Sequence, residues 1–350
     1  MFDALLWRWV PLAAALLLNG CSTLDYYSHL AGGQLHLLQA REPIAELLEN
    51  PTADPELKQR LALAQQARDF ASAQLSLPDN DSYRLYADIQ RPFVVWNVFA
   101  TPEFSLSPEL HCFPIAGCVA YRGFYSQSRA RGSAALLKQQ GLDTYLGGVE
   151  AYSTLGWFDD PILNTMLRWS DERLVAVIFH ELAHQQLYVA NDTAFNESFA
   201  SFVEREGLSQ WRIKQGLPPN DPQGEQQREQ FIALVLASRT RLQQLYASDL
   251  PPAQMRSGKQ AEIARLRAEY HALSKREWGG SGRYDDWINA PINNAKLLPF
   301  GLYDQWVPAF AALFEQVERD WPRFYQRVAA LGELPERERH QALMDLSAGS

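Results

Sequence analysis

Residues 170–189 read SDERLVAVIFHELAHQQLYV, and this stretch decides much of the fold. Apolar residues occupy most of the circumference of a helix drawn through it, so the helix is expected to be buried. Ser170 suits an N-cap, and the two acidic residues after it fall in the first turn, where the helix dipole favours negative charge. The sequence sets His180, Glu181 and His184 inside this apolar helix, where polar side chains need partners.

The two histidines are four residues apart, so their imidazoles lie one turn apart on the same helix face. Both can direct a ring nitrogen at one ion, and Glu181 projects beside that face towards water held by the ion. H-E-x-x-H is the arrangement of zinc peptidases. We therefore predict one zinc ion per chain, with His180 and His184 as ligands and Glu181 as the general base. The alternative is a pair of core histidines with hydrogen-bonded partners.

A catalytic zinc site needs a third protein ligand and one open position. A metzincin would carry a glycine at position 187 and a histidine at position 190, but Leu187 and Ala190 stand there. The third ligand is therefore expected among the carboxylates that follow the helix.

Glu197 is the predicted third ligand. It lies early in a second helix, TAFNESFASFVEREG, which is expected to end at Gly207 and to pack antiparallel to the first helix. Asp192 lies in the turn and is expected to cap the second helix. Glu204 lies about two turns further on, where it is expected to be exposed or to support a ligand.

The composition excludes several classes of partner. The 350 residues include 32 Lys and Arg against 41 Asp and Glu, which gives a net charge of −9. Nucleic acid is bound through excess positive charge, so we expect no nucleic-acid partner. A hydrophobic content of 47% with 21% charged residues is that of a globular chain with a real core.

The first residues resemble a bacterial lipoprotein signal. Residues 1–20 form a signal peptide with a short apolar run, and Cys21 follows Gly20 as the expected site of lipid attachment. Membrane attachment would come from this lipid anchor, and Ser22 suggests the outer membrane, facing the periplasm. The alternatives are a plain secretory signal and a buried N-terminal helix. No later segment reaches eighteen consecutive apolar residues.

Two cysteines remain, Cys112 and Cys118. In the oxidising periplasm that the lipoprotein signal implies, they are expected to form a disulfide. The alternatives are two free thiols, or a metal site completed by His111.

The remaining pattern predicts an α+β fold, predominantly helical, with a small mixed sheet of about four strands at residues 93–153 and a helical hairpin. One helix, about Ser126 to Gln140, interrupts the strands. The hairpin is expected to pair residues 223–247 with 252–275 through Pro251-Pro252. One domain, residues 21–350, is divided into helices at 22–90, a sheet-rich part at 91–160, zinc-site helices at 161–207, the hairpin at 221–277 and C-terminal helices at 291–350.

The sequence resembles the gluzincin metallopeptidases in H-E-L-A-H followed by N-E-S-F-A. It is more closely similar to a family of bacterial envelope lipoproteins classed as aminopeptidases. That resemblance rests on the lipid cysteine, C-V-A-Y-R-G at 118–123, A-Y-S-T-L-G-W-F-D-D-P at 151–161 and N-N-A at 293–295. It implies a zincin-like fold and a zinc-dependent aminopeptidase acting on a peptide substrate through zinc-activated water.

Several further residues are candidates for substrate contacts. The strand TYLGGVEAYS, residues 144–153, is a candidate edge for binding peptide backbone, and Gly147-Gly148 would permit close approach. Glu150 could bind a free α-amine, or it could be a solvated carboxylate. Trp157 and Phe158 could line a pocket or pack in the core.

An oxyanion donor is also expected. The candidates are Tyr152, Tyr284, Tyr303 and Arg122, each of which could equally be structural.

Two other functions remain open. One is a metal-dependent hydrolase of another envelope substrate, such as a cell-wall peptide. The other is a non-catalytic binding or assembly lipoprotein whose metal site is structural or silent. The sequence names no protein partner.

Overall fold

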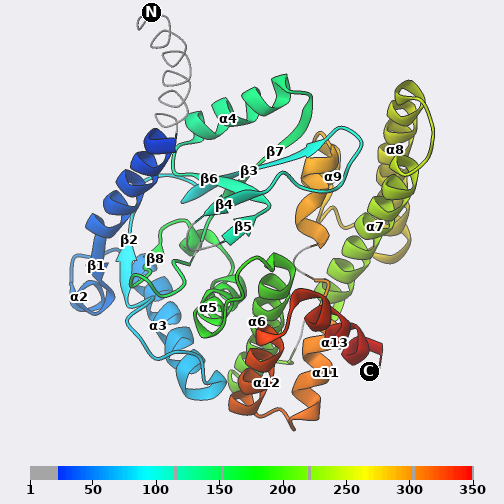
Figure 1. Ribbon diagram of the computed structural model, residues 1–350. Helices are drawn as coiled ribbons and strands as arrows, with labels where there is room; N and C mark the ends of the chain where they lie inside the picture. The colour runs from blue at the N-terminus through cyan, green and yellow to red at the C-terminus, as the bar shows by residue number, and fades with distance from the viewer. Residues whose placement is uncertain (1–22, 114–116, 152, 220–221, 302–303, 349–350) are drawn as a thin grey trace, which may run out of the picture.

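The computed structural model describes residues 23–113, 117–151, 153–219, 222–301 and 304–348 (Figure 1). Cys21 and the predicted signal peptide lie outside these residues. Most of the described chain is helical, in agreement with the predicted α+β class. The helices are residues 23–39, α2 (Ile44–Glu49), α3 (Pro55–Leu75), α4 (Gln127–Gln139), α5 (Asp171–Gln186), α6 (Thr193–Lys214), α7 (Pro222–Tyr246), α8 (Pro252–Glu277), α9 (Asp285–Asn289), α10 (Asn294–Leu297), α11 (Val307–Gln316), α12 (Trp321–Glu333) and α13 (Glu336–Ala348), with 3₁₀ turns at Met166–Arg168 and Leu298–Gly301.

The strands form three small sheets rather than the one sheet that we predicted. Their orders are β1-β2-β8, β6-β3-β7 and β4-β5. The strands are β1 (Arg41–Pro43), β2 (Leu85–Ala87), β3 (Val95–Pro102), β4 (His111–Phe113), β5 (Gly117–Val119), β6 (Tyr121–Phe124), β7 (Leu142–Val149) and β8 (Ile162–Leu163). Within the predicted sheet region, residues 117–124 are split at Ala120, since β5 pairs with β4 and β6 pairs with β3. The first sheet was missed because strands of two or three residues carry no readable alternation.

The sheet β6-β3-β7 is antiparallel and has two different faces. Its outer face, which includes Val98 and Phe124, packs on Ala130 of α4 and Tyr26 of the first helix. Its inner face looks towards α5 and α6, which lie next to each other below the sheet in Figure 1. A layer of helices therefore covers each face of this sheet.

The main core surrounds α5. Helix α5 packs against α3 and α6, and its apolar side chains join a cluster that continues into α11 and α12. The Ser170 hydroxyl accepts a hydrogen bond from the backbone N–H of Arg173, so the predicted N-cap is confirmed. The fully buried members that α5 contributes are Leu174, Val175, Ile178, Phe179, Leu182 and Ala183.

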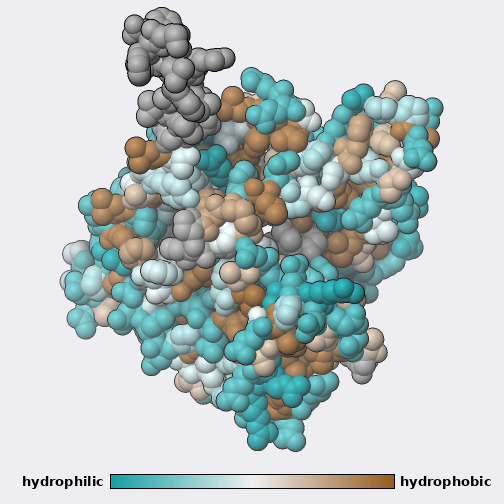
Figure 2. Space-filling model, viewed as in Figure 1, coloured by the Kyte–Doolittle hydropathy of each residue, from teal (hydrophilic) through white to brown (hydrophobic). Residues whose placement is uncertain are grey.

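Helices α7 and α8 pack against each other as the predicted hairpin. A second apolar cluster, with Phe231 from α7 and Tyr270 from α8, fills the space between the hairpin and α9. On the face shown in Figure 2, hydrophilic residues cover much of the hairpin, and hydrophobic patches lie near α4 and in the middle of the view. Within the described residues, no helix is both long and apolar enough to span a bilayer.

Gly207 does not end α6, which corrects our prediction. The helix continues to Lys214, and the chain leaves it at Gly216, whose φ is +73°. Gly207 is instead a point of close packing. A Cβ atom built there would lie 2.7 Å from Leu75 Cδ1 of α3 and 2.9 Å from Phe179 Cδ2 of α5. The missing side chain lets α3, α5 and α6 approach one another.

We expect Gly207→Ala to lower the unfolding free energy by about 1–3 kcal/mol, because the added methyl overpacks the contact between three helices. Gly132 of α4 provides the matched control, since a Cβ atom there meets nothing within 4 Å. Gly132→Ala should raise the unfolding free energy by about 0.5–1 kcal/mol through helix propensity alone. Urea unfolding followed by circular dichroism measures both. Equal effects of the two substitutions would contradict the packing role of Gly207.

Candidate metal centre

Helix α5 presents His180 and His184 on one face, as their spacing predicted. Their ring centroids are 4.8 Å apart, and their Nε2 atoms face each other at 3.2 Å. Both side chains are buried because the helix that carries them is enclosed by α3, α6 and the inner face of the sheet. The two imidazoles therefore meet in a region from which most water is excluded.

Helix α6 brings Glu197 back to the two histidines. Glu197 Oε2 lies 3.5 Å from His180 Nε2 and 3.7 Å from His184 Nε2. The reversal is made in the turn after α5, where the Asn196 side chain hydrogen-bonds the N–H and the C=O of Val189 at 2.8 and 2.7 Å. The turn therefore sets where the carboxylate lies relative to the imidazoles.

Asp192 has the capping role that we expected. Its carboxylate accepts the N–H of Phe195 at the start of α6 and also pairs with Arg339 at 2.8 Å and His340 at 2.9 Å. These contacts tie the turn between α5 and α6 to α13. Asp192 is thus used for structure and takes no part in the donor cluster.

The donor cluster fits a single metal ion. His180, His184 and Glu197 each offer one ligand atom, and the three atoms lie within 4.8 Å of one another. Ligands about 2.0–2.1 Å from a tetrahedral zinc ion are about 3.3 Å apart, close to the separations of 3.2, 3.5 and 3.7 Å found here. Two ring nitrogens and a carboxylate oxygen also match the preference of zinc for nitrogen and oxygen donors.

Glu204 supports the first imidazole. Its Oε2 lies 2.9 Å from His180 Nδ1, on the side of the ring opposite Nε2. If Nδ1 donates to this carboxylate, Nε2 keeps its lone pair for a metal. This contact fits the supporting role expected of Glu204, while the metal that His180 would bind stays a prediction.

Electrostatics in the cluster favours a cation. Burial raises the pKa of Glu197, but His184 and His180 outweigh it and bring the pKa to about 2. Burial lowers the pKa of His180, but Glu197 and Glu204 raise it well above its usual value. Three carboxylates around two imidazoles therefore favour a positive charge among them. This charge can be a proton on an imidazole or a metal ion that displaces the proton.

Glu181 lies beside the donor cluster and is buried. Burial raises the pKa of its carboxyl, while the neighbouring imidazoles oppose that shift. It lines the same cavity as the three donor residues. A buried carboxylate next to a metal site is suited to accepting and returning a proton.

A cavity of about 310 Å³ lies between the two helices and the inner face of the sheet. This size is near the lower end of small-molecule sites. Its lining is Val95, Asn97, Phe113, Val119, Tyr121, Gly123, Val149, Ala151, Ser153, Leu155, His180, Glu181, His184, Tyr188, Thr193, Asn196 and Glu197.

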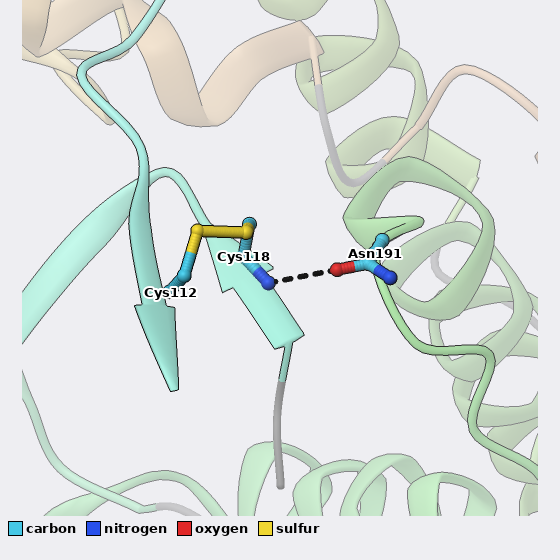
Figure 3. The surroundings of a disulfide bond; sticks show 3 residues. All are labelled: Cys112, Cys118 and Asn191. Atoms are coloured by element: carbon cyan, nitrogen blue, oxygen red, sulfur yellow. Dashed lines mark hydrogen bonds between the residues drawn. A yellow bond between two sulfur atoms is a disulfide. The ribbon is translucent and has the colours of Figure 1, made fainter. Parts of the chain in front are cut away.

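A disulfide hairpin forms one wall of the cavity. The structure joins Cys112 of β4 to Cys118 of β5, and Phe113 and Val119 of these strands line the cavity. The backbone N–H of Cys118 donates to Asn191 Oδ1 at 2.9 Å (Figure 3). Asn191 belongs to the turn between α5 and α6, so the disulfide hairpin is joined to the two helices that carry the donor cluster.

Three sequence candidates lie away from the cavity. The guanidinium of Arg122 lies over the Tyr26 ring at 3.9 Å, on the outer face of the sheet. Tyr284 stacks on Phe231 in the apolar cluster between the helical hairpin and α9, with 4.0 Å between the ring centroids. Glu150 accepts hydrogen bonds from Trp169 Nε1 and Arg173 Nη2, so it is neither a lining residue nor simply solvated.

Two other candidates, Tyr152 and Tyr303, fall outside the described residues. Trp157 and Phe158 are 66% and 45% exposed, so neither packs in the core, and neither lines the cavity.

Sequence reasoning missed two tyrosines of the cavity, Tyr121 and Tyr188. Burial, with Glu197 nearby, raises the pKa of both hydroxyls, so they remain neutral hydrogen-bond donors. The signal for Tyr121 was present, since it lies in the C-V-A-Y-R-G segment. We predicted a role for its neighbour Arg122, but alternation along a strand places the two on opposite faces, and Tyr121 is the one that lines the cavity.

The residues define a candidate mononuclear metal centre of the hydrolase kind, with a buried carboxylate beside the donors. The sequence model of the family described as "Putative aminopeptidase" matches residues 25–343. The chain belongs to this family, which confirms the aminopeptidase family that the motifs indicated. No curated protein and no solved structure matches the chain.

We expect Glu204→Gln to weaken zinc binding by about 10- to 100-fold, because His180 loses the carboxylate that orients it. Glu197→Gln, which removes a donor, should weaken binding further. Glu206→Gln is the matched control, since Glu206 lies on the same helix but pairs with Arg319 and Gln210. Competition with a chromophoric chelator measures the three affinities. If Glu204→Gln binds zinc as tightly as Glu206→Gln, the supporting role is wrong.

Asp160 anchors the loop that supplies Ser153 and Leu155 to the cavity. Its carboxylate accepts the N–H of Thr154 at 2.8 Å and contacts the Ser153 hydroxyl at 3.4 Å. Burial raises the pKa of Asp160 to about 6. The folded chain therefore holds this proton more tightly than the unfolded chain does.

The contribution of Asp160 to stability should be full below pH 4 and lost as the pH rises through about 6. Asp160→Asn, which mimics the protonated form, should remove this dependence. The difference in unfolding free energy between wild type and Asp160→Asn should change by up to about 3 kcal/mol between pH 4 and pH 7. Urea unfolding at several pH values measures it, with the exposed neighbour substitution Asp159→Asn as control. Parallel curves for wild type and Asp160→Asn would refute the assignment.

Proposed function

We propose that the chain is a zinc-dependent aminopeptidase that hydrolyses peptide bonds in a zincin-like fold. The observation that carries the proposal is the common cavity of the donor cluster and Glu181. Three potential ligands and one further buried carboxylate line a space large enough for a small peptide segment. Membership of the family supports the same reading, since its description names an aminopeptidase.

Each side chain then has a distinct task. His180, His184 and Glu197 would hold one zinc ion, which supplies Lewis acidity towards a scissile carbonyl and a water molecule. Glu181 accepts a proton from the attacking water and returns it to the leaving amine. Glu204 keeps His180 in the required orientation. The neutral hydroxyls of Tyr121 and Tyr188 donate hydrogen bonds to the oxygen on which negative charge develops.

The proposal extends to the location of the protein. We assign it to the outer membrane of a bacterial envelope, facing the periplasm and attached through lipid on Cys21. The Cys112–Cys118 disulfide supports a location outside the reducing cytosol. The anchor itself rests on the sequence signal alone.

Glu181→Gln should lower the rate of peptide hydrolysis by at least about 100-fold, because the substitution removes the proton acceptor. It should retain one zinc ion per chain, because it removes no ligand. Glu172→Gln, in the exposed first turn of the same helix, is the control and should keep full activity. Peptide cleavage is measured together with metal content by atomic absorption. If the wild-type protein contains no zinc, or if Glu181→Gln keeps full activity, the proposed peptidase mechanism is wrong.

Aminopeptidase action is tested with the same protein by comparing peptides that have free and acetylated N-termini. Cleavage restricted to the free peptides is expected. Equal cleavage of both leaves a peptidase but removes the aminopeptidase assignment. Cleavage of cell-wall peptide alone would favour the alternative function, a metal-dependent hydrolase of another envelope substrate.

A further inference from the structure

The inner face of the central sheet carries one amide among apolar, aromatic and glycine neighbours. Alternation and pairing register place ten residues on this face. Thr101 and Asp143 lie at one end of it, and the other eight lie at or around Asn97. They are Val95, Asn97 and Phe99 from β3, Tyr121 and Gly123 from β6, and Tyr145, Gly147 and Val149 from β7. Asn97 lies in the middle of the central strand, where asparagine is disfavoured. Its position therefore needs an explanation other than strand formation.

Glycines flank Asn97 on both sides. The register pairs Asn97 with Gly123 of β6 and with Gly147 of β7. Cross-strand partners normally fill the space beside a side chain, since their Cβ atoms lie about 4.5–5.5 Å away. Here both partners lack a side chain. A Cβ atom at Gly123 would lie 3.3 Å from Asn97 Oδ1. Glycine in a strand marks close approach by another backbone. The side chains of Val95 and Asn97 lie over Gly123, since the added Cβ atom would also lie 3.2 Å from Val95 Cγ1. A Cβ atom at Gly147 would meet only ordinary contacts, so the gap beside Asn97 is on the Gly147 side.

The side-chain amide of Asn97 has no hydrogen-bond partner among the described residues, although it is half-buried in the cavity lining. The strand that carries it has both edges paired, with β6 and with β7. A ligand crossing this face therefore cannot pair with the backbone of β3. It meets a side-chain donor and a side-chain acceptor instead.

The chemistry of the gap matches a peptide group. A side-chain amide offers one C=O and one NH₂, which complement the N–H and C=O of a main-chain amide. A free ammonium would need a carboxylate. Among the described lining residues the carboxylates are Glu181 and Glu197, which the proposed function already uses.

We infer that Asn97 binds a main-chain peptide group of the substrate and that Gly147, which has no side chain beside Asn97, makes room for it. This inference rests on the proposed function, because it takes the ligand of the cavity to be a peptide. One carbonyl of that peptide lies at the donor cluster, and a further peptide group reaches the sheet on the opposite side of the cavity. Asn97 is thereby a substrate-binding residue that takes no part in proton transfer. The substrate must carry at least one peptide group beyond the metal-binding carbonyl.

Two metal-chelating probes on the zinc-loaded full chain test this without turnover. Acetohydroxamate offers only the chelating group, whereas 3-amino-2-hydroxy-5-methylhexanoyl-valyl-valine offers a free amine and a chelating hydroxyl and carbonyl, followed by a further peptide group on the C-terminal side. Asn97→Ala should weaken binding of the second probe by about tenfold, as expected for a lost hydrogen bond, and leave the first unchanged. Gln139→Ala, on the exposed surface of α4, is the control. Zinc content and the unfolding midpoint are measured for each variant.

Gly147→Ala tests the gap separately. Its Cβ would lie 3.5 Å from Tyr145 Cε1 and 3.8 Å from Phe99 Cε2, which are ordinary contacts, so the variant should fold normally. It should nevertheless weaken the peptide probe alone, because the methyl group occupies the space beside Asn97. Unchanged affinity of that probe in both Asn97→Ala and Gly147→Ala would overturn the inference and leave the proposed function standing.

Asn97→Asp distinguishes a peptide group from an ammonium. It should bind the peptide probe more weakly than wild type, because the donor is lost and a charge is added near two carboxylates. Tighter binding would overturn the inference, since it would identify the ammonium as the partner. Failure of wild type to bind acetohydroxamate would instead count against the proposed function, and the inference would fall with it.

Discussion

The burial of α5 is the constraint on which the rest of the structure depends. From Leu174 to His184 every side chain except the half-buried Val177 is buried, so α3, α6 and the sheet must enclose this part of the helix. Enclosure also traps His180 and His184, whose nitrogens then need partners inside the protein. Glu197 and Glu204 supply these partners from the neighbouring helix. Hydrophobic packing and the polar centre are therefore one arrangement, because the helix that fills the core also carries the imidazoles.

The precision of the centre comes from the turn between α5 and α6. Asn196 closes the turn on itself through Val189, and Asp192 fastens it to Arg339 of α13. Both contacts are buried or nearly so, where hydrogen bonds are strongest. A carboxylate on α6 can therefore keep a fixed place relative to the imidazoles on α5. Gly207 contributes at the other end by letting α3, α5 and α6 approach closely.

Local pattern was sufficient wherever helical geometry alone sets positions. The spacing of His180 and His184 fixed their common face, and the antiparallel return brought Glu197 to them. What the sequence could not yield depends on contacts between distant segments. Asn97 and Tyr121 reach the cavity only because the sheet packs over α5, and no local period encodes that docking. The same holds for β8, a two-residue strand whose partner, β2, is far away in the chain, and for Gly207, whose role depends on two other helices.

The disulfide hairpin gives the cavity an unusual dependence on its surroundings. Phe113 and Val119 belong to strands of three residues each, a length at which a two-stranded hairpin is marginally stable by itself. A hydrogen bond from the Cys118 backbone to Asn191 joins this hairpin to the turn between α5 and α6. The disulfide joins these two short strands covalently into one wall of the cavity. In a reducing compartment the chain would carry its potential metal ligands without this covalent link, so the redox state of the compartment bears on how firmly the wall is held.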